Sequence, residues 1–311
     1  MRLVHSVGLT SAALLLALLP GAAGGHLVAG TAPDTAGTGR GARGGDVAYG
    51  PAERLGEGRI RVFREDADDR PRSLGVVLSA SALTGLPTTP TDGEHCLDAD
   101  GDGRVHPSHE CVGGHGLELS LPDGPAGRAG PGLPFRWVLF NWNPQGHKPH
   151  GRYDVPHFDV HFYLVPRETR DGIRLGRCAL LIDCAQLSTA AEPVPAAHLP
   201  EGYPASSPET AEGAMGEHLD SRPASAGSLT GHTFIYGAYG GEIVFMEPML
   251  TKAFLEGLRA TPPHRTCAPV PQPRAWRAPG WYPTRYCMAY RPAHDDYTVT
   301  LTDFTPSDSA R

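Results

Sequence analysis

Pro156-His157-Phe158-Asp159-Val160-His161-Phe162-Tyr163 is the stretch that decides the fold of this 311-residue chain. After the proline, polar and apolar residues alternate strictly. Successive side chains of a β-strand point to opposite faces of a sheet. We therefore expect His157, Asp159 and His161 on one face, where they could bind metal. Phe158, Val160 and Phe162 are expected on the other, buried face. The aromatic and β-branched content and the flanking prolines favour a strand over a helix.

The rest of the chain has the same character. Short alternating or apolar segments predict further strands at residues 59–63, 73–80, 116–121, 135–142, 232–236, 242–246, 286–290 and 297–304. The 39 glycines and 31 prolines indicate many turns. One short helix is expected in the C-terminal half, with Pro248 in its first turn and an apolar stripe from Met249 to Leu258. The predicted fold class is mainly β, an antiparallel sandwich or barrel with that single helix.

Three regions are expected along the chain. Residues 1–25 have a positive start, a short apolar core and a small-residue exit, which is typical of a secretory signal peptide. Residues 26–50 are rich in Gly, Ala and Thr and predict a disordered leader. Residues 51–311 predict a single β-rich domain with an acidic insertion at 92–115. We thus expect a secreted or extracytoplasmic protein without a membrane anchor after signal cleavage. The net charge of -7 and the lack of a basic run argue against nucleic acid and anionic membranes as partners.

Six cysteines in an exported chain suggest three disulfides. Fifteen pairings are open to six cysteines, and neighbourhood in the sequence favours Cys96 with Cys111, Cys178 with Cys184, and Cys267 with Cys287.

The histidines of the central strand cannot form a metal site alone. His157 and His161 would stand about 13 Å apart along a strand, so other segments must supply ligands. The candidates are His147, His218, His232 and Glu247. A two-histidine, one-carboxylate set with open positions suits zinc or non-haem iron. Two alternatives stay open: structural histidines that only form hydrogen bonds, and metal-free acid–base chemistry.

The acidic insertion resembles the first half of a calcium-binding loop. Asp98, Asp100 and Asp102 occupy loop positions 1, 3 and 5, and Arg104 offers its carbonyl at position 7. The second half departs from the pattern, because position 12 is a histidine and Glu110 comes one place late. We expect a structural calcium site, with a solvated acidic loop as the alternative. The chain carries no P-loop, dinucleotide-binding glycine motif or nucleophile elbow.

Several ordered blocks carry a family resemblance. They are LTGLPTTP (83–90), WNPQGHKPHGRYDVPHFDVHFYLV (142–165), EGYP (201–204), MGEHLD (215–220), HTFIYGAYGGEIVFMEPMLTKAFLE (232–256), GWYPTRYCMAY (280–290) and YTVTLTDF (297–304). Their order resembles a bacterial exported family of unknown function, which includes a member controlled by an extracytoplasmic-stress sigma factor. The resemblance implies a β-rich fold and a ring-like or other homo-oligomeric assembly. It implies no activity. The blocks contain all seven candidate metal ligands, which strengthens the metal hypothesis.

Three functions are compatible with these observations. The first is an exported protein that binds metal through the PHFDVHFY strand, with little or no catalysis. The second is a metal-dependent enzyme acting on a small molecule, with the loop 186–230 as a lid. The third is a metal-free structural or stress-related oligomer.

Overall fold

The computed structural model describes residues 46–68, 70–123 and 132–308. These residues belong to one structural unit, which begins at Arg43. The predicted signal peptide and residues 26–45 of the predicted leader lie outside the described residues. Residues 46–49 of that leader form a strand instead, because they pair antiparallel with residues 63–66 of the domain.

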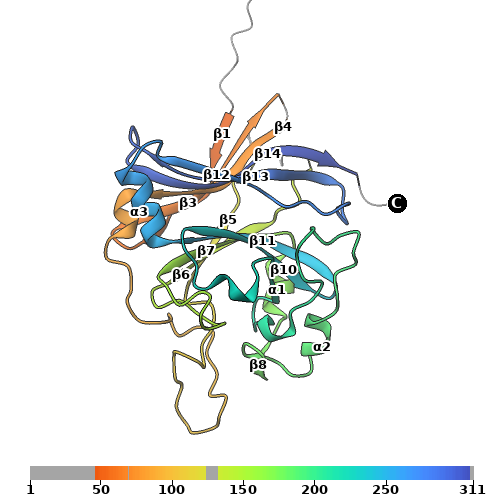
Figure 1. Ribbon diagram of the computed structural model, residues 1–311. Coiled ribbons are helices and arrows are strands. Elements are labelled where there is room, and N and C mark those ends of the chain that lie inside the picture. The colour runs from red at the N-terminus through yellow and green to blue at the C-terminus, as the bar shows by residue number, and fades with distance from the viewer. Residues whose placement is uncertain (1–45, 69, 124–131, 309–311) are drawn as a thin grey trace, which may run out of the picture. The chain divides into compact units, whose positions relative to one another are not determined.

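Two antiparallel sheets form the fold (Figure 1). The first has the order β1-β3-β4-β14-β13-β12, with β2 paired to β3. Its strands are β1 (Asp46–Tyr49), β2 (Glu53–Leu55), β3 (Gly58–Ala67), β4 (Arg70–Ser79), β12 (Arg265–Pro269), β13 (Gly280–Arg291) and β14 (Asp296–Ser307). The second has the order β5-β6-β7-β11-β10-β9. Its strands are β5 (His115–Ser120), β6 (Trp137–Asn143), β7 (His157–Tyr163), β9 (Glu217–Asp220), β10 (His232–Tyr239) and β11 (Glu242–Thr251).

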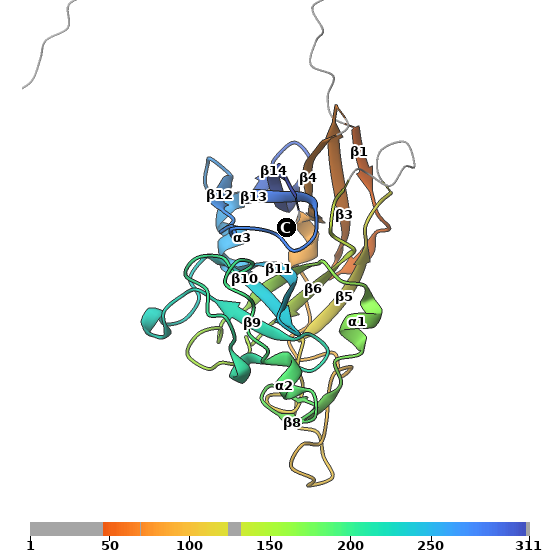
Figure 2. The same cartoon turned by 90° about the vertical axis from the view of Figure 1, so that its right-hand side faces the viewer.

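The sheets face each other across one apolar core. Phe158, Val160 and Phe162 of β7 lie in the same buried cluster as Ile60 and Val76 of the first sheet. Figure 2 shows the two layers from the side. Neither sheet closes on itself within the described residues. The mainly β, antiparallel prediction is therefore confirmed, and the fold is a sandwich rather than a barrel.

A layer of connecting segments covers the outer face of the second sheet. All seven residues of β6 and all seven of β7 are buried, although one face of a sandwich sheet usually meets solvent. Segments around residues 90, 110, 148, 180 and 214 surround a cavity over this face. In Figure 1 this layer lies below the sheet, with the acidic insertion at the bottom of the view. The polar face of β7 is consequently an interior surface.

The helical elements are short and come mostly from this covering layer. They are α1 (Arg167–Asp171), α2 (Leu187–Ala190), α3 (Lys252–Ala260) and the 3-10 turns η1 (Ala80–Leu83), η3 (Pro208–Thr210) and η4 (Ala224–Ala226); the short strand β8 (Leu175–Cys178) also lies here. The segment 186–230, expected to be a loop, thus contains α2, η3, β9 and η4. No described helix has the length and apolarity needed to cross a membrane.

The predicted helix starts later than expected. Pro248, placed by the sequence in its first turn, lies within β11 opposite Phe234. The β7–β11 ladder pairs Met246 with Phe162 and resumes with Met249 opposite Asp159. Proline fits because it donates no ladder hydrogen bond at this interruption. Thr251 then caps α3 by accepting a hydrogen bond from the Phe254 amide, at 3.1 Å.

Cys96 is bonded to Cys111, Cys178 to Cys184, and Cys267 to Cys287. These are the pairs that neighbourhood in the sequence suggests. The first two cross-link segments within the covering layer, and the third joins β12 to β13.

Candidate metal centre

The polar face of β7 brings its side chains to the middle of the second sheet. Cross-strand pairing sets Asp159 opposite Asn141 and His157 opposite Asn143 on β6, and Asp159 opposite Met249 on β11. His157, Asp159 and His161 are at most 4% exposed. Isolated ionised groups are unfavourable in such surroundings unless they are paired or bind a metal. The face therefore needs partners from the loops.

His147 is brought in by the connection between β6 and β7. The turn from Asn143 to Gly146 closes with a hydrogen bond from the Gly146 amide to the Asn143 carbonyl. Gly146 has a φ of 74°, and a side chain there would meet the Tyr153 carbonyl oxygen at 1.9 Å. The turn needs glycine for both reasons. It sets the His147 Nε2 atom 3.3 Å from Asp159 Oδ2.

We call His147, His157 and Asp159 the His147 cluster, since these three residues could hold one metal ion between them. Each imidazole has a main-chain carbonyl oxygen as its second partner. Nδ1 of His147 lies 2.6 Å from the Lys148 carbonyl oxygen, and Nδ1 of His157 lies 2.6 Å from the Val155 carbonyl oxygen. A carbonyl only accepts, so each Nδ1 must carry the proton. In the neutral ring the Nε2 lone pair then faces Asp159. At His157, the Nδ2 atom of Asn143 also lies 3.4 Å from Nε2.

The distances to Asp159 match a shared ion better than direct hydrogen bonds. Nε2 of His157 lies 3.2 Å from Asp159 Oδ1, yet that buried oxygen has no hydrogen-bond partner. Charge-assisted N–H···O bonds are normally about 2.7–2.9 Å long. Two ligand atoms on one tetrahedral zinc stand about 3.3–3.5 Å apart, given bond lengths of about 2.0–2.2 Å. Asn143 fixes the carboxylate by donating to Oδ2 at 2.6 Å.

Without metal, charge in the His147 cluster must be balanced by protons. Burial works against the charged form of His147, but the Asp159 carboxylate outweighs it and raises the pKa of His147 to about 9. Burial would likewise raise the pKa of Asp159, but the His157 and His147 imidazoles hold it well below its ordinary range. A metal ion would replace the proton on His147 as the counter-charge of Asp159.

A second group, the His161 cluster, consists of His161, His218 and Glu247. Glu247 lies on β11. His218 lies on β9, where it pairs with Gly237 of β10. His161 and Glu247 are each 1% exposed. Burial lowers the pKa of His161 to about 3 and that of His218 to about 4, and it raises the pKa of Glu247 well above its ordinary value. Burial thus disfavours the charged form of all three side chains.

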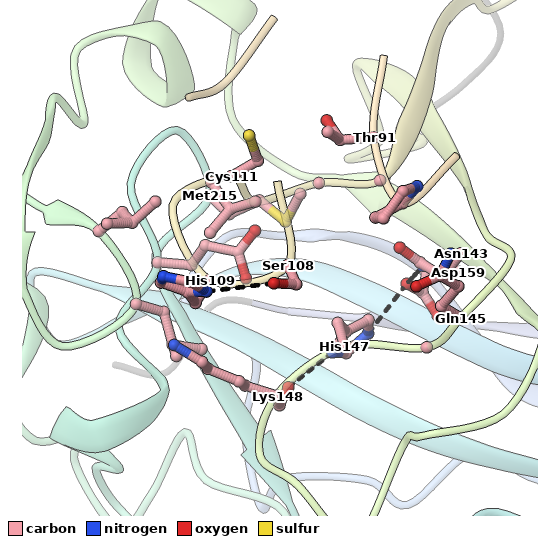
Figure 3. A pocket seen from close by; sticks show the side chains of 18 of the residues that line it. Thr91, Ser108, His109, Cys111, Asn143, Gln145, His147, Lys148, Asp159 and Met215 are labelled. Atoms are coloured by element: carbon pink, nitrogen blue, oxygen red, sulfur yellow. Dashed lines mark hydrogen bonds and ion pairs between the residues drawn. The ribbon is translucent and has the colours of Figure 1, made fainter. Parts of the chain in front are cut away.

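One cavity of about 180 Å³ reaches both clusters. Its wall includes His147, Asp159, His161 and His218. In Figure 3, His147 lies between Asp159 and the Lys148 main chain, and Met215, Ser108 and His109 stand across the space. The cavity offers a small ligand or water access to the polar face of the sheet.

Glu212 is a cavity residue that sequence reasoning missed. It comes from the 186–230 segment and is 8% exposed. Burial raises its pKa to about 7, with His147 opposing and Asp159 reinforcing the shift. Asn143, which fixes Asp159, was missed too. Glu212 lies in a segment without periodicity, so no sequence signal pointed to it. Asn143 lies one residue beyond the predicted strand 135–142, and extending that strand by one residue would have given its side-chain direction.

His232 lies outside both clusters. Its Nδ1 atom lies 2.9 Å from the Tyr286 hydroxyl of the first sheet, and its ring packs against Phe254. The structure thus places six of the seven predicted ligands in the two clusters and gives His232 a structural hydrogen bond.

The acidic insertion brings together only part of the predicted calcium set, Asp98, Asp100 and Glu110. Glu110 is buried and accepts hydrogen bonds from the amides of Ala99, Asp100 and His106. Asp102 instead has its Oδ2 atom 3.1 Å from His106 Nε2, and its Oδ1 atom accepts a hydrogen bond from the Arg104 amide. Calcium binding by this loop stays a prediction.

Comparison of the chain with protein-family models, curated proteins and solved structures gives no match in any of the three.

Proposed function

We propose that this chain is an exported protein that binds a transition-metal ion, zinc or ferrous iron, through His147, His157 and Asp159. The observation that carries the proposal is the shared arrangement of the two histidines. Each donates its Nδ1 proton to a main-chain carbonyl at 2.6 Å and turns Nε2 toward the same carboxylate. Metal-bound histidines typically have such a carbonyl or carboxylate partner, which fixes the tautomer and the ring orientation.

The donor atoms support the choice of metal. Two imidazole nitrogens and one carboxylate suit zinc or ferrous iron, whereas calcium and magnesium prefer oxygen ligands alone. All six cysteines are in disulfides, so thiolate ligands do not compete.

Export is supported by the same disulfides. Three disulfides in one chain indicate an oxidising environment, because cytosolic thiols are kept reduced. The N-terminal segment with the features of a secretory signal supplies the route in this proposal.

Metal analysis of His157→Ala tests the proposal. The full chain, exported from its host and purified without a histidine tag, is analysed by plasma mass spectrometry after loading with zinc and gel filtration. The variant should lose one equivalent of zinc relative to the wild type, because a structural or catalytic zinc site needs at least three protein ligands. The matched control, His294→Ala, removes an exposed histidine on the β13–β14 hairpin. It should keep the zinc content of the wild type. Equal zinc in all three proteins would contradict the proposal.

The cavity favours a second candidate function, a metal-dependent enzyme acting on a small molecule. Three protein ligands leave a coordination position open, as in catalytic zinc sites, and His147 and Asp159 line the cavity. In the cobalt-substituted protein, azide should then change the visible absorption spectrum by occupying that position. A spectrum that azide leaves unaltered would indicate a closed site and argue against the enzyme.

A further inference from the structure

The His161 cluster holds polar atoms that the described chain does not satisfy. Both ring nitrogens of His161 and the Oε2 atom of Glu247 are buried without a hydrogen-bond partner. Buried polar groups in folded proteins are nearly always paired. Of these atoms, Nε2 of His161 faces the Glu247 carboxyl group, so His161 Nε2 and Glu247 Oε2 point to a missing partner between the two side chains.

The distances identify what kind of partner fits. His161 Nε2 lies 3.6 Å from Glu247 Oε1, and His218 Nε2 lies 4.0 Å from Glu247 Oε2. Both separations are too long for hydrogen bonds. Both lie above the about 3.3–3.5 Å of two ligand atoms on a tetrahedral zinc, but below about 4.2 Å, the sum of the two bond lengths and so the upper limit for two ligands of one ion. A single ion can therefore touch all three side chains, whereas the side chains cannot bond directly to each other.

The surroundings of the cluster favour a cation over a water molecule. Glu247 forms ion-pair contacts only with the two histidines among the described residues. One side of the site is covered by an aromatic ring: the Phe245 ring packs on His161 and His218 with centroid distances of 4.8 and 5.3 Å. A divalent ion would supply the charge that a buried carboxylate needs and would accept both imidazole lone pairs.

The site is separate from the His147 cluster. The ligand atoms form two groups, each within 4.8 Å. Asp159 and His161 are two residues apart on β7, which is about 6–7 Å, so their strand positions direct them to different points of the same face. Both groups nevertheless line one cavity, through which ions could enter.

We propose that the chain binds a second divalent transition-metal ion at His161, His218 and Glu247, so that two ions sit side by side on the outer face of the second sheet. The two-histidine, one-carboxylate donor set is the same as in the His147 cluster and again suits zinc or ferrous iron. The second site shares no residue with the first. Its existence therefore does not depend on whether the proposed function is correct.

Metal stoichiometry of paired variants tests the second site. The exported full chain is loaded with zinc in the presence of calcium, which occupies any oxygen-only site, and bound zinc is counted per chain. We expect two equivalents in the wild type, one in Glu247→Gln, one in His157→Ala and none in the double variant. The exposed-site control His294→Ala should retain two.

Other outcomes separate the two proposals. One equivalent in the wild type that survives Glu247→Gln and disappears in His157→Ala would overturn the second site and leave the first. One equivalent with the opposite behaviour would overturn the first site and leave the second. No bound zinc in the wild type would overturn both.

A second variant guards against misfolding of Glu247→Gln. His218→Ala alters a ligand whose side chain is 15% exposed, at the rim of the site, and should also retain one equivalent. Circular dichroism confirms the fold of each variant. If neither variant folds, titration of the zinc-loaded wild type with a strong chelator counts the released zinc: two equivalents support the second site, and one equivalent overturns it.

Discussion

At the scale of single residues, the second ring nitrogen decides the role of each histidine. His147 and His157 have Nδ1 on a main-chain carbonyl and direct Nε2 toward Asp159, the arrangement on which the proposed metal site rests. His161 has both nitrogens unpartnered. His232 has a hydroxyl partner, Tyr286, and needs no ion. Histidines around one sheet thus differ in their immediate partners, and the proposed metal ligands differ from His232 in this respect.

His232→Ala should leave the metal content unchanged and lower stability by about 1–2 kcal/mol at pH 7.5, through loss of the hydrogen bond to Tyr286. Burial lowers the pKa of His232 below its ordinary value. The folded wild type therefore resists protonation of this ring, so its stability advantage over the variant is full above about pH 6.5 and shrinks as the pH falls through the folded-state pKa.

Urea unfolding of both proteins at pH 7.5 and pH 5 measures this difference, and the other histidines cancel because both proteins contain them. A stability gap that widens at pH 5, or a loss of metal from the variant, would refute the structural role of His232.

At the scale of elements, β10 depends on a residue without a side chain. A Cβ atom at Gly237 would lie 2.0 Å from the Phe245 ring of β11. The ring can lie over β10 only because this position is glycine, and from there it packs on His161 and His218. Gly237 is thus part of the framework that holds the His161 cluster.

Gly237→Ala should destabilise the chain by about 1–3 kcal/mol, because the ring must move within a closely packed layer. Gly257→Ala is the matched control: Gly257 lies inside α3 with no atom within 4 Å of an added Cβ. Alanine there should stabilise the chain by about 0.5–1 kcal/mol. Urea midpoints of the two variants on opposite sides of the wild type would bear this out, and a Gly237→Ala midpoint at or above the wild type would not.

At the scale of the whole molecule, the sandwich and its covering layer have separate tasks. The core between the sheets fixes β6, β7 and β11, and with them Asp159, His161 and Glu247. The covering layer brings His147 and Glu212 over that face, and β9 of the same sheet brings His218. Two disulfides, Cys96–Cys111 and Cys178–Cys184, lie within this layer. Such cross-links restrict the unfolded chain and favour the ordering of long loops.

Homo-oligomeric assembly stays a prediction.

Much of the architecture could be predicted from local pattern. Alternation in PHFDVHFY established the strand and its two faces, since side-chain direction in a strand has a period of two residues. The same rule separated His157 from His161, which belong to different clusters in the structure. Pro248 was misplaced because a proline can begin a helix or fill an unpaired strand position, and only the neighbouring strand decides which.

By itself, the sequence determined the polar face of the central strand, the six cysteines available for disulfides and the short list of ligand candidates. Only the tertiary structure decided how those candidates divide. It joined His147 to Asp159 through a turn and carried His218 to Glu247 across Gly237. It also placed His232 beside Tyr286 of the first sheet, where the two side chains form a hydrogen bond. Strand geometry reaches a few residues along the chain, whereas coordination joins atoms that are distant in sequence and about 3–4 Å apart in space.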